Sequence, residues 1–148
     1  MTANDLLKLH EQVIDSWNRH DSKKFLALMD ENVVFNDTGI ARPIKGKAEL
    51  EKYFTEWIAA FPDFKMKTLN TVISDDCIAA EVECSGTHTG SLKTFDRPEI
   101  PATNKKLTSR ISFFAKVKNG KTIDVRIYSD VAGMMTQLGL HELQEAHA

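Results

Sequence analysis

The chain has 148 residues, of which 42% are hydrophobic and 27% are charged, so its composition is that of a globular protein and not of a disordered one. Its formal net charge is −2 and its lysines and arginines are scattered, which excludes the concentrated positive charge of proteins that bind nucleic acid or anionic membranes. The length fits one domain over residues 1–148, and no apolar segment is long enough for a membrane span, so we expect a cytoplasmic protein.

An amphipathic helix is predicted over residues 5–18, where apolar residues recur at steps of three and four. Either Thr2 or Asn4 can cap its amino end, because short polar side chains accept hydrogen bonds from the first free N–H groups. The same periodicity places His10 and His20 at the surface, on or beside this helix.

Two further helices and a short strand are predicted next. Asp21 is a natural N-cap for a second, shorter helix, and the segment NVVFND after it is predicted to be a strand. In GKAELEKYFTEWIAAFPDF the apolar residues form one continuous helical stripe, which Pro62 ends.

Beyond this proline the apolar pattern changes to a period of two. FKMKTLNTVIS and CIAAEVECSGTHTG are predicted to be antiparallel strands joined at Asp75-Asp76. The polar segment SLKTFDRPEIPATNKK contains two prolines and is predicted to lack regular structure. LTSRISFFAKVK and TIDVRIYSD flank Asn119-Gly120, which is a strong hairpin signal. Helices followed by antiparallel strands predict an α+β domain, with the helices on one face of a curved sheet.

Several kinds of site are excluded by residue spacing. Cys77 and Cys84 are seven residues apart in one predicted strand, so they point to opposite faces and form neither a disulfide nor a shared metal site. His141 and His147 in HELQEAH are six residues apart, which is not the zinc-binding H-E-x-x-H arrangement. The chain has no glycine-rich phosphate loop after a strand and no nucleophile elbow. We therefore predict neither a metal nor an organic cofactor.

The Asn119-Gly120 turn also predicts which side chains share a face of the hairpin. Counting outward from a two-residue turn places Phe113 opposite Arg126 and Ile111 opposite Tyr128. In that register Arg126 and Tyr128 lie on the same face as Asp130, next to aromatic and aliphatic side chains. A carboxylate in such surroundings is typical of a ligand pocket.

Asp130 has two interpretations, which the sequence leaves equally open. A helical pattern, VAGMMTQLGL, begins directly after it, and aspartate is a favoured N-cap. Partial burial against aromatic groups would instead adjust its pKa for proton transfer, because burial raises the pKa of a carboxyl and a nearby arginine lowers it.

His88, in SGTHTG, likewise has two interpretations, a solvated loop histidine or a hydrogen-bonding group at the mouth of a cavity. Six aromatic residues lie on predicted inward faces and are expected in the core, where some of them line the cavity. They are Trp17, Phe35, Trp57, Phe61, Phe64 and Phe113.

Four segments together resemble the SnoaL-like polyketide cyclases, which belong to the superfamily of nuclear transport factor 2-like and ketosteroid isomerase-like folds. These segments are WNRHD, GKAELEKYFTEWIAAFPDF, GTHTG and NGKTIDVRIYSDVAGMMTQLGL, so the resemblance extends over nearly the whole chain. It implies a cone-shaped α+β barrel that encloses a pocket, and a homodimer formed through the sheet. IPATNKK stands where the family often has PPTGK, which implies a different pocket rim.

The resemblance also implies roles for particular residues. The aspartate that matches Asp130 is the general acid/base of an intramolecular aldol ring closure in the family, without metal or organic cofactor. His88 matches a pocket position, and Arg126 and Tyr128 match positions that face the cavity.

These observations lead to the hypothesis of a cofactor-independent acid/base enzyme acting on a small, largely apolar carbonyl compound. Asp130 would move a proton α to the carbonyl, while His88 or Tyr128 holds the enolate. Arg126 would orient the acid, and the six aromatic residues, with Arg126 and Tyr128, would contact the substrate. The alternatives are a non-catalytic small-molecule-binding domain, or an isomerase, dehydratase or epoxide hydrolase on the same scaffold. Epoxide opening needs a second pocket acid, and Asp124 is the only candidate on the predicted face.

Overall fold

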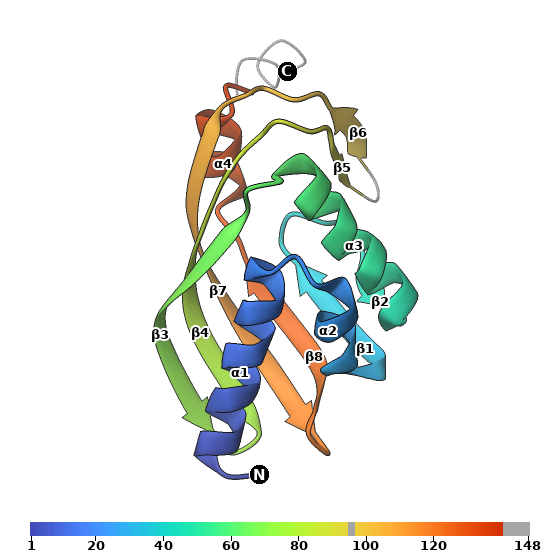
Figure 1. Ribbon diagram of the computed structural model, residues 1–148, viewed down its shortest axis with the longest axis vertical. Coiled ribbons are helices and arrows are strands. Elements are labelled where there is room, and N and C mark those ends of the chain that lie inside the picture. The colour runs from blue at the N-terminus through green and yellow to red at the C-terminus, as the bar shows by residue number, and fades with distance from the viewer. Residues whose placement is uncertain (95–96, 141–148) are drawn as a thin grey trace.

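Helices cover one face of a curved six-stranded sheet in the structure, a computed structural model that describes residues 1–94 and 97–140 (Figure 1). The strand order is β2-β1-β8-β7-β4-β3, and β5 and β6 form a separate pair. The elements are α1 (Ala3–Asn18), α2 (Ser22–Ala27), β1 (Met29–Asp37), β2 (Ile44–Lys45), α3 (Gly46–Ala60), β3 (Lys65–Ser74), β4 (Cys77–Thr87), β5 (Leu92–Thr94), β6 (Arg97–Ile100), β7 (Lys106–Lys118), β8 (Lys121–Tyr128) and α4 (Val131–Gln137). The predicted α+β class is thereby confirmed.

The helix boundaries follow from local capping chemistry. Thr2, and not Asn4, caps α1, because its Oγ1 accepts from the backbone N–H of Asp5 at 3.1 Å while the Asp5 carboxylate accepts from the Thr2 N–H at 2.8 Å. Asp21 caps α2 by accepting from the backbone N–H of Lys24. The third helix, α3, ends at Ala60, just before the predicted stop at Pro62.

The β7–β8 hairpin contains a bulge that the sequence analysis did not predict. Its turn has positive φ at both Asn119 and Gly120, as a type I′ turn requires, and Val117 pairs with Thr122 in the predicted register. The next pair is Lys116 with Asp124, so Ile123 is an extra residue. Every pair beyond it is shifted by one position.

This shift reverses the face on which two predicted site residues lie. Phe113 pairs with Ile127 on the concave face, while Arg126 pairs with Phe114 and Tyr128 with Ser112. Tyr128 is 49% exposed, and Arg126 is also exposed, on the sheet face that the helices leave open. The prediction that Arg126 and Tyr128 face the cavity is therefore wrong.

The segment predicted to lack regular structure contains the short β5–β6 hairpin. Leu92 pairs with Ile100, and β5 packs against α3. The side chain of Leu92 is fully buried, so this strand pair closes one part of the core despite the proline in β6.

Other sequence expectations concern the cysteines and membrane segments. Both cysteines are free, with Cys84 buried on the concave face and Cys77 half-buried. None of the helices in residues 1–94 and 97–140 combines the length and the apolar character of a membrane span. His141 and His147 lie outside the described residues.

Candidate active site

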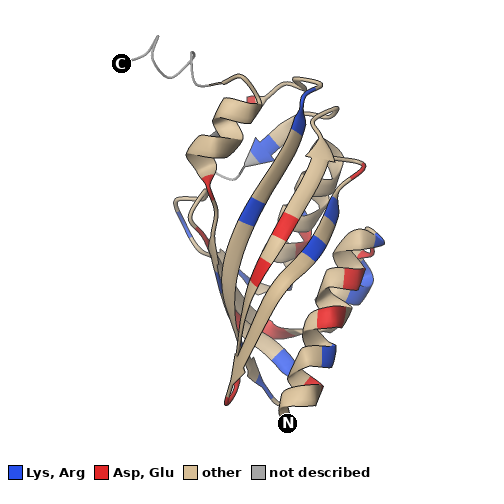
Figure 2. Ribbon diagram, turned by 90° about the vertical axis from the view of Figure 1, so that its left-hand side faces the viewer, with Lys and Arg blue, Asp and Glu red and all other residues tan. Residues whose placement is uncertain are grey.

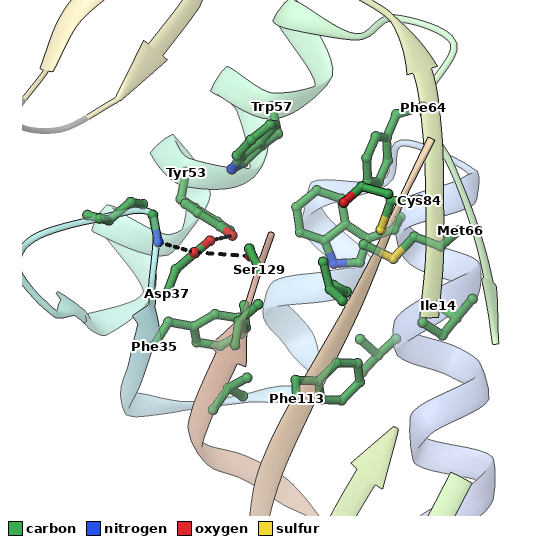
Figure 3. A pocket seen from close by; sticks show the side chains of 18 of the residues that line it. Ile14, Phe35, Asp37, Tyr53, Trp57, Phe64, Met66, Cys84, Phe113 and Ser129 are labelled. Carbon is green, nitrogen blue, oxygen red and sulfur yellow. Dashed lines mark hydrogen bonds between the residues drawn. The ribbon is translucent and has the colours of Figure 1, made fainter. Parts of the chain in front are cut away.

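An apolar cavity of about 160 Å³ lies between the helices and the concave face of the sheet. Its wall includes side chains from α1, α2, α3 and α4 and from five strands of the sheet. Five of the six predicted aromatic residues line it, as Figure 3 shows in part: Trp17, Phe35, Trp57, Phe64 and Phe113. An enclosed apolar space of this kind is typical of a small-molecule site.

Phe61 is the predicted aromatic residue that does not line the cavity. It is fully buried and stacks between Trp57, at a centroid distance of 5.9 Å, and His88, at 5.2 Å. The helical stripe that suggested a cavity position continues past the cavity at this end of α3 and packs into the core.

A buried carboxylate that the sequence analysis missed, Asp37, lies in the cavity wall. Asp37 is 8% exposed. Its Oδ2 accepts a hydrogen bond from the hydroxyl of Tyr53 at 2.8 Å, and its Oδ1 accepts from the Gly39 N–H at 2.8 Å and the Ser129 hydroxyl at 3.4 Å (Figure 3). These hydrogen bonds replace those that the carboxylate would make to water, and so offset the cost of burying its negative charge.

Two parallel strands place Asp37 beside the segment that carries Asp130. Asp37 ends β1 and pairs with Ile127 of β8. Thr38 then bonds across, with its Oγ1 accepting from the Ser129 N–H at 2.9 Å and its own N–H donating to the Ile127 carbonyl. The ends of β1 and β8 are therefore held together, with one carboxylate on each.

The hydroxyl of Tyr53 is a neutral donor in this site. Burial raises the pKa of Tyr53 well above its ordinary value, and the adjacent negative charge of Asp37 adds to this effect. The proton consequently stays on Tyr53, where it is shared with the Asp37 carboxylate.

Asp130 combines the two interpretations that the sequence left open. Its Oδ1 accepts from the backbone N–H of Gly133 at 2.9 Å, so it is the N-cap of α4. It also contributes to the wall of the cavity, although the residue as a whole is exposed. Asp130 thus lies where the cavity meets solvent, whereas Asp37 lies inside.

His88 is buried, contrary to the solvated interpretation, but it does not line the cavity. Its Nδ1 accepts from the backbone N–H of Thr103 at 3.3 Å and lies 3.0 Å from the Thr103 hydroxyl. The proton of the neutral ring is therefore on Nε2, which has no hydrogen-bond partner among the described residues. Burial lowers the pKa of His88. In this conformation Phe61 covers one face of the ring.

A second histidine, His10, is buried in the cavity wall, so the prediction that it lies at the surface is wrong. It is 3% exposed, its Nε2 lies 2.9 Å from the Thr68 hydroxyl, and its ring contacts that of Phe113. Burial lowers the pKa of His10, so the imidazole is neutral at pH 7.

Asp124, the only second acid that the predicted register offered, lies outside the cavity. The same bulge turns it to the open face of the sheet, where its carboxylate is 3.9 Å from the guanidinium of Arg126. The second acid of the cavity is Asp37. Among the described residues, no group of three or more histidine, cysteine and acidic side chains could hold a metal ion.

The cavity and its acids occur in a chain whose sequence matches a known family. The family model for SnoaL-like polyketide cyclases matches residues 8–138. The chain belongs to this family. A search of curated proteins found no significant match.

Solved structures similar to this SnoaL-like chain support the same fold. A candidate SnoaL-like polyketide cyclase from Jannaschia sp. CCS1 superposes with a TM-score of 0.80 at 12% identity, covering 91% of this chain and 92% of that one. IdmH from Streptomyces antibioticus, a candidate polyketide cyclase, gives 0.73 at 18% identity, covering 89% and 96%. AclR from Streptomyces galilaeus, a candidate hydroxylase, gives 0.78 at 17% identity, covering 93% and 83%. At these identities the likeness establishes the fold alone.

Proposed function

We propose that this chain is a cofactor-independent enzyme that moves a proton α to the carbonyl of a small, largely apolar compound, as in an aldol cyclisation. The observation that carries the proposal is the buried carboxylate of Asp37 in the wall of an otherwise apolar cavity. A carboxylate whose hydrogen bonds are already arranged and whose surroundings exclude water is suited to take a proton from carbon.

The two acids have different tasks in this proposal. Asp37 removes the α-proton, and the enolate carbon forms the new bond to a second carbonyl of the same molecule. Asp130, at the rim and in contact with solvent, passes a proton from water to the oxygen of that second carbonyl, and Asp37 returns the α-proton to water. The reaction is then an isomerisation in which no atom is gained or lost.

Tyr53 provides the hydrogen bond that stabilises the enolate. While Asp37 is ionised, the Tyr53 hydroxyl donates to its Oδ2. Once Asp37 carries the substrate proton it needs this bond less, and the same hydroxyl can donate to the enolate oxygen. We assign this task to Tyr53 and not to His88 or Tyr128, because neither of those side chains lines the cavity.

Proton exchange at carbon tests this proposal without knowledge of the natural substrate. A panel of small ketones is incubated with the protein in D₂O, and deuterium entering the α-position is followed by NMR. We expect Asp37→Asn to lower the exchange rate by about 10²- to 10⁴-fold, the usual contribution of a general base. If no ketone exchanges faster than in buffer, or if exchange is undiminished in Asp37→Asn, the proton-transfer proposal is wrong.

Two other functions are distinguished by the same panel. Ketones that bind without exchange would indicate a non-catalytic binding domain. The presence of two carboxylates at the ends of β1 and β8 also favours addition of water, as in epoxide opening, because Asp37 is the second acid that this chemistry requires. Hydrolysis of a small apolar epoxide, lost in either asparagine variant, would support that alternative.

We also propose that the chain forms a homodimer through the open face of its sheet, as the family resemblance implies. This face carries exposed apolar side chains on neighbouring strands, with Phe114 41% exposed and its ring 6.2 Å from that of Tyr128. Val72 and Ala79 continue the row, since Val72 pairs with Ala79 and Ala79 pairs with Phe114. Figure 2 shows acidic and basic residues on adjacent strands of this side, a mixture that a two-fold interface can pair.

A further inference from the structure

We infer that the ligand of this cavity is an elongated, largely apolar molecule of one or two rings with an uncharged polar group at each end, one contacted by Asp37 and Tyr53 and the other by His10. This inference rests on the proposed function, because it places the reacting carbonyl at the Asp37 end. It adds the identity of the opposite end and the residue that recognises it.

The size of the cavity limits the ligand. A cavity of about 150 Å³ lined by aliphatic and aromatic side chains is large enough to hold benzene. The present cavity has about 160 Å³ and has the exposed residue Asp130 in its wall, so one substituted ring or two fused rings fit its size. Its aromatic walls favour stacking against a planar ring system.

His10 is a buried polar residue of the wall to which the proton-transfer proposal assigns no task. Its Nε2 lies 2.9 Å from the Thr68 hydroxyl, and its Nδ1 makes no hydrogen bond to any described residue. This Nδ1 is not among the fully buried atoms that lack a partner, so it remains accessible to a bound molecule. Since the ring lines the cavity, a ligand atom is the partner that the described structure leaves possible.

Asp37 and His10 lie on opposite sides of the cavity. Asp37 is at the end of β1, and His10 packs against Thr68 of β3, while β8, β7 and β4 lie between these two strands in the curved sheet. In Figure 3, Asp37, Tyr53 and Ser129 are on one side, whereas Ile14 and Met66 are on the other. Ile14 is one helical turn beyond His10, and Met66 is two residues before Thr68.

The wall of the cavity between Asp37 and His10 determines the polarity of the middle part of the ligand. It is formed mainly by Trp17, Phe35, Phe64 and Phe113 with aliphatic neighbours. A polar substituent placed there would lose its water without gaining a hydrogen bond, which is unfavourable. The ligand is therefore apolar between its ends.

The charge of the far group follows from the state of His10. A neutral imidazole accepts or donates one hydrogen bond but does not compensate a carboxylate. A hydroxyl or a carbonyl is consequently the group that fits, and an anionic group at that end would be buried without a counter-charge.

The test compares matched ligand pairs that differ in one hydrogen-bonding group. The probes are 4-hydroxyacetophenone against 4-methylacetophenone, and 6-acetyl-2-naphthol against 2-acetyl-6-methylnaphthalene, with dissociation constants from calorimetry or NMR titration. One of the two pairs should match the length of the cavity. In that pair we expect the hydroxyl compound to bind about three- to tenfold more tightly than its methyl analogue, which is the effect of one neutral hydrogen bond. In His10→Leu this ratio should fall to about one, while in Glu11→Gln, an exposed change on the same helix outside the cavity, it should be unchanged.

A second measurement does not depend on the variant folding. In wild-type protein the ¹⁵N resonance of His10 Nδ1 should shift with the hydroxyl ligand and not with its methyl analogue. The inference is overturned if no pair binds, if neither hydroxyl is preferred, or if the preference persists in His10→Leu. Binding is measured without turnover, so these results test only the recognition of the ligand by His10. Absence of α-proton exchange would instead overturn the proposed function and leave the ligand inference standing.

Discussion

The hydroxyl of Tyr53 donates a 2.8 Å hydrogen bond to Oδ2 of Asp37 inside an apolar cavity, and the two residues come from α3 and β1. This bond joins the helical layer to the sheet at the proposed site of proton transfer. It also makes Tyr53 and Asp37 interdependent, because removal of either leaves the other polar group buried without its partner.

Replacement of Tyr53 by phenylalanine should therefore lower both stability and activity. The variant leaves one oxygen of Asp37 without a donor, which should cost about 1–3 kcal/mol of unfolding free energy. The α-exchange rate should also fall, since the enolate loses its donor. Denaturant unfolding and D₂O exchange measure the two effects. Tyr128→Phe is the matched control, because this tyrosine is exposed on the open face of the sheet, and it should change stability by less than about 0.5 kcal/mol.

The capping and catalytic roles of Asp130 can be separated by substitution. Asn caps a helix about as well as Asp, so Asp130→Asn should retain stability and lose turnover, whereas Asp130→Ala should also lose about 0.5–2 kcal/mol of unfolding free energy. Thermal unfolding and exchange rates measured on both variants check this. Equal activity in Asp130→Asn and wild type would leave Asp130 as a cap only.

Gly133→Ala should displace the Asp130 carboxylate without removing it. A Cβ at Gly133 would overlap Oδ2 of Asp130, so the carboxylate must move. Alanine gains up to about 1 kcal/mol of helix propensity, which offsets the lost cap, so stability should change little. Activity should fall by about 100-fold if position matters as proposed. Thr136→Ala, an exposed change in the same helix, is the control and should leave activity unchanged.

The bulge at Ile123 explains why the elements of this fold could be predicted and the register of its hairpin could not. Helices and long strands follow from periodicity and caps, and the structure confirms those predicted, whereas the short strands β2, β5 and β6 were missed. A bulge has no residue signature of its own. It was nevertheless detectable as a conflict, because Val125 and Ile127 require the concave face while the turn register sends them to the open face.

Strand and helix periodicity also shows which site residues could have been predicted from the sequence. In NVVFND, Val33, Phe35 and Asp37 alternate onto one face, so the apolar pattern already placed Asp37 inward. His10 lies four residues from Ile14 and one from Leu9, at the edge of the apolar stripe, and its burial depends on Thr68 of β3. That contact joins residues 58 positions apart, and local periodicity contains no information on it.

The two buried histidines predict a loss of stability in mild acid. Burial lowers the pKa of both His10 and His88 below the ordinary 6.5. Below about pH 6.5 the unfolded chain therefore binds more protons than the folded one, so stability is full above this pH and declines as the pH falls towards the folded-state pKa values. Unfolding free energies measured between pH 7.5 and 5 should show this decline, and His88→Gln should reduce it. A decline of equal size in His88→Gln would mean that His88 does not contribute.

The proposed dimer predicts an effect of charge on the open face of the sheet. Phe114→Glu places a carboxylate in the exposed apolar row, opposite Arg126 of its own chain but inside the proposed interface. The variant should sediment as a monomer at concentrations where wild type sediments as a dimer, and its folding should be unchanged by circular dichroism. Lys8→Glu, at an exposed position of α1 on the opposite side of the sheet, is the control for added negative charge. A wild-type monomer in analytical ultracentrifugation would remove the basis for the dimer.

The reactivity of Cys84 reports whether the cavity opens in solution. Burial raises the pKa of Cys84 to about 12, so at pH 8 only about one molecule in ten thousand carries the reactive thiolate. Iodoacetamide should therefore modify Cys77, which is half-buried outside the cavity, well before Cys84. Mass spectrometry of digested samples distinguishes the two sites, and a ligand that fills the cavity should slow modification of Cys84 further. Cys84 modification as fast as that of Cys77 would mean that the cavity opens readily, and the argument that water is excluded from Asp37 would then fail.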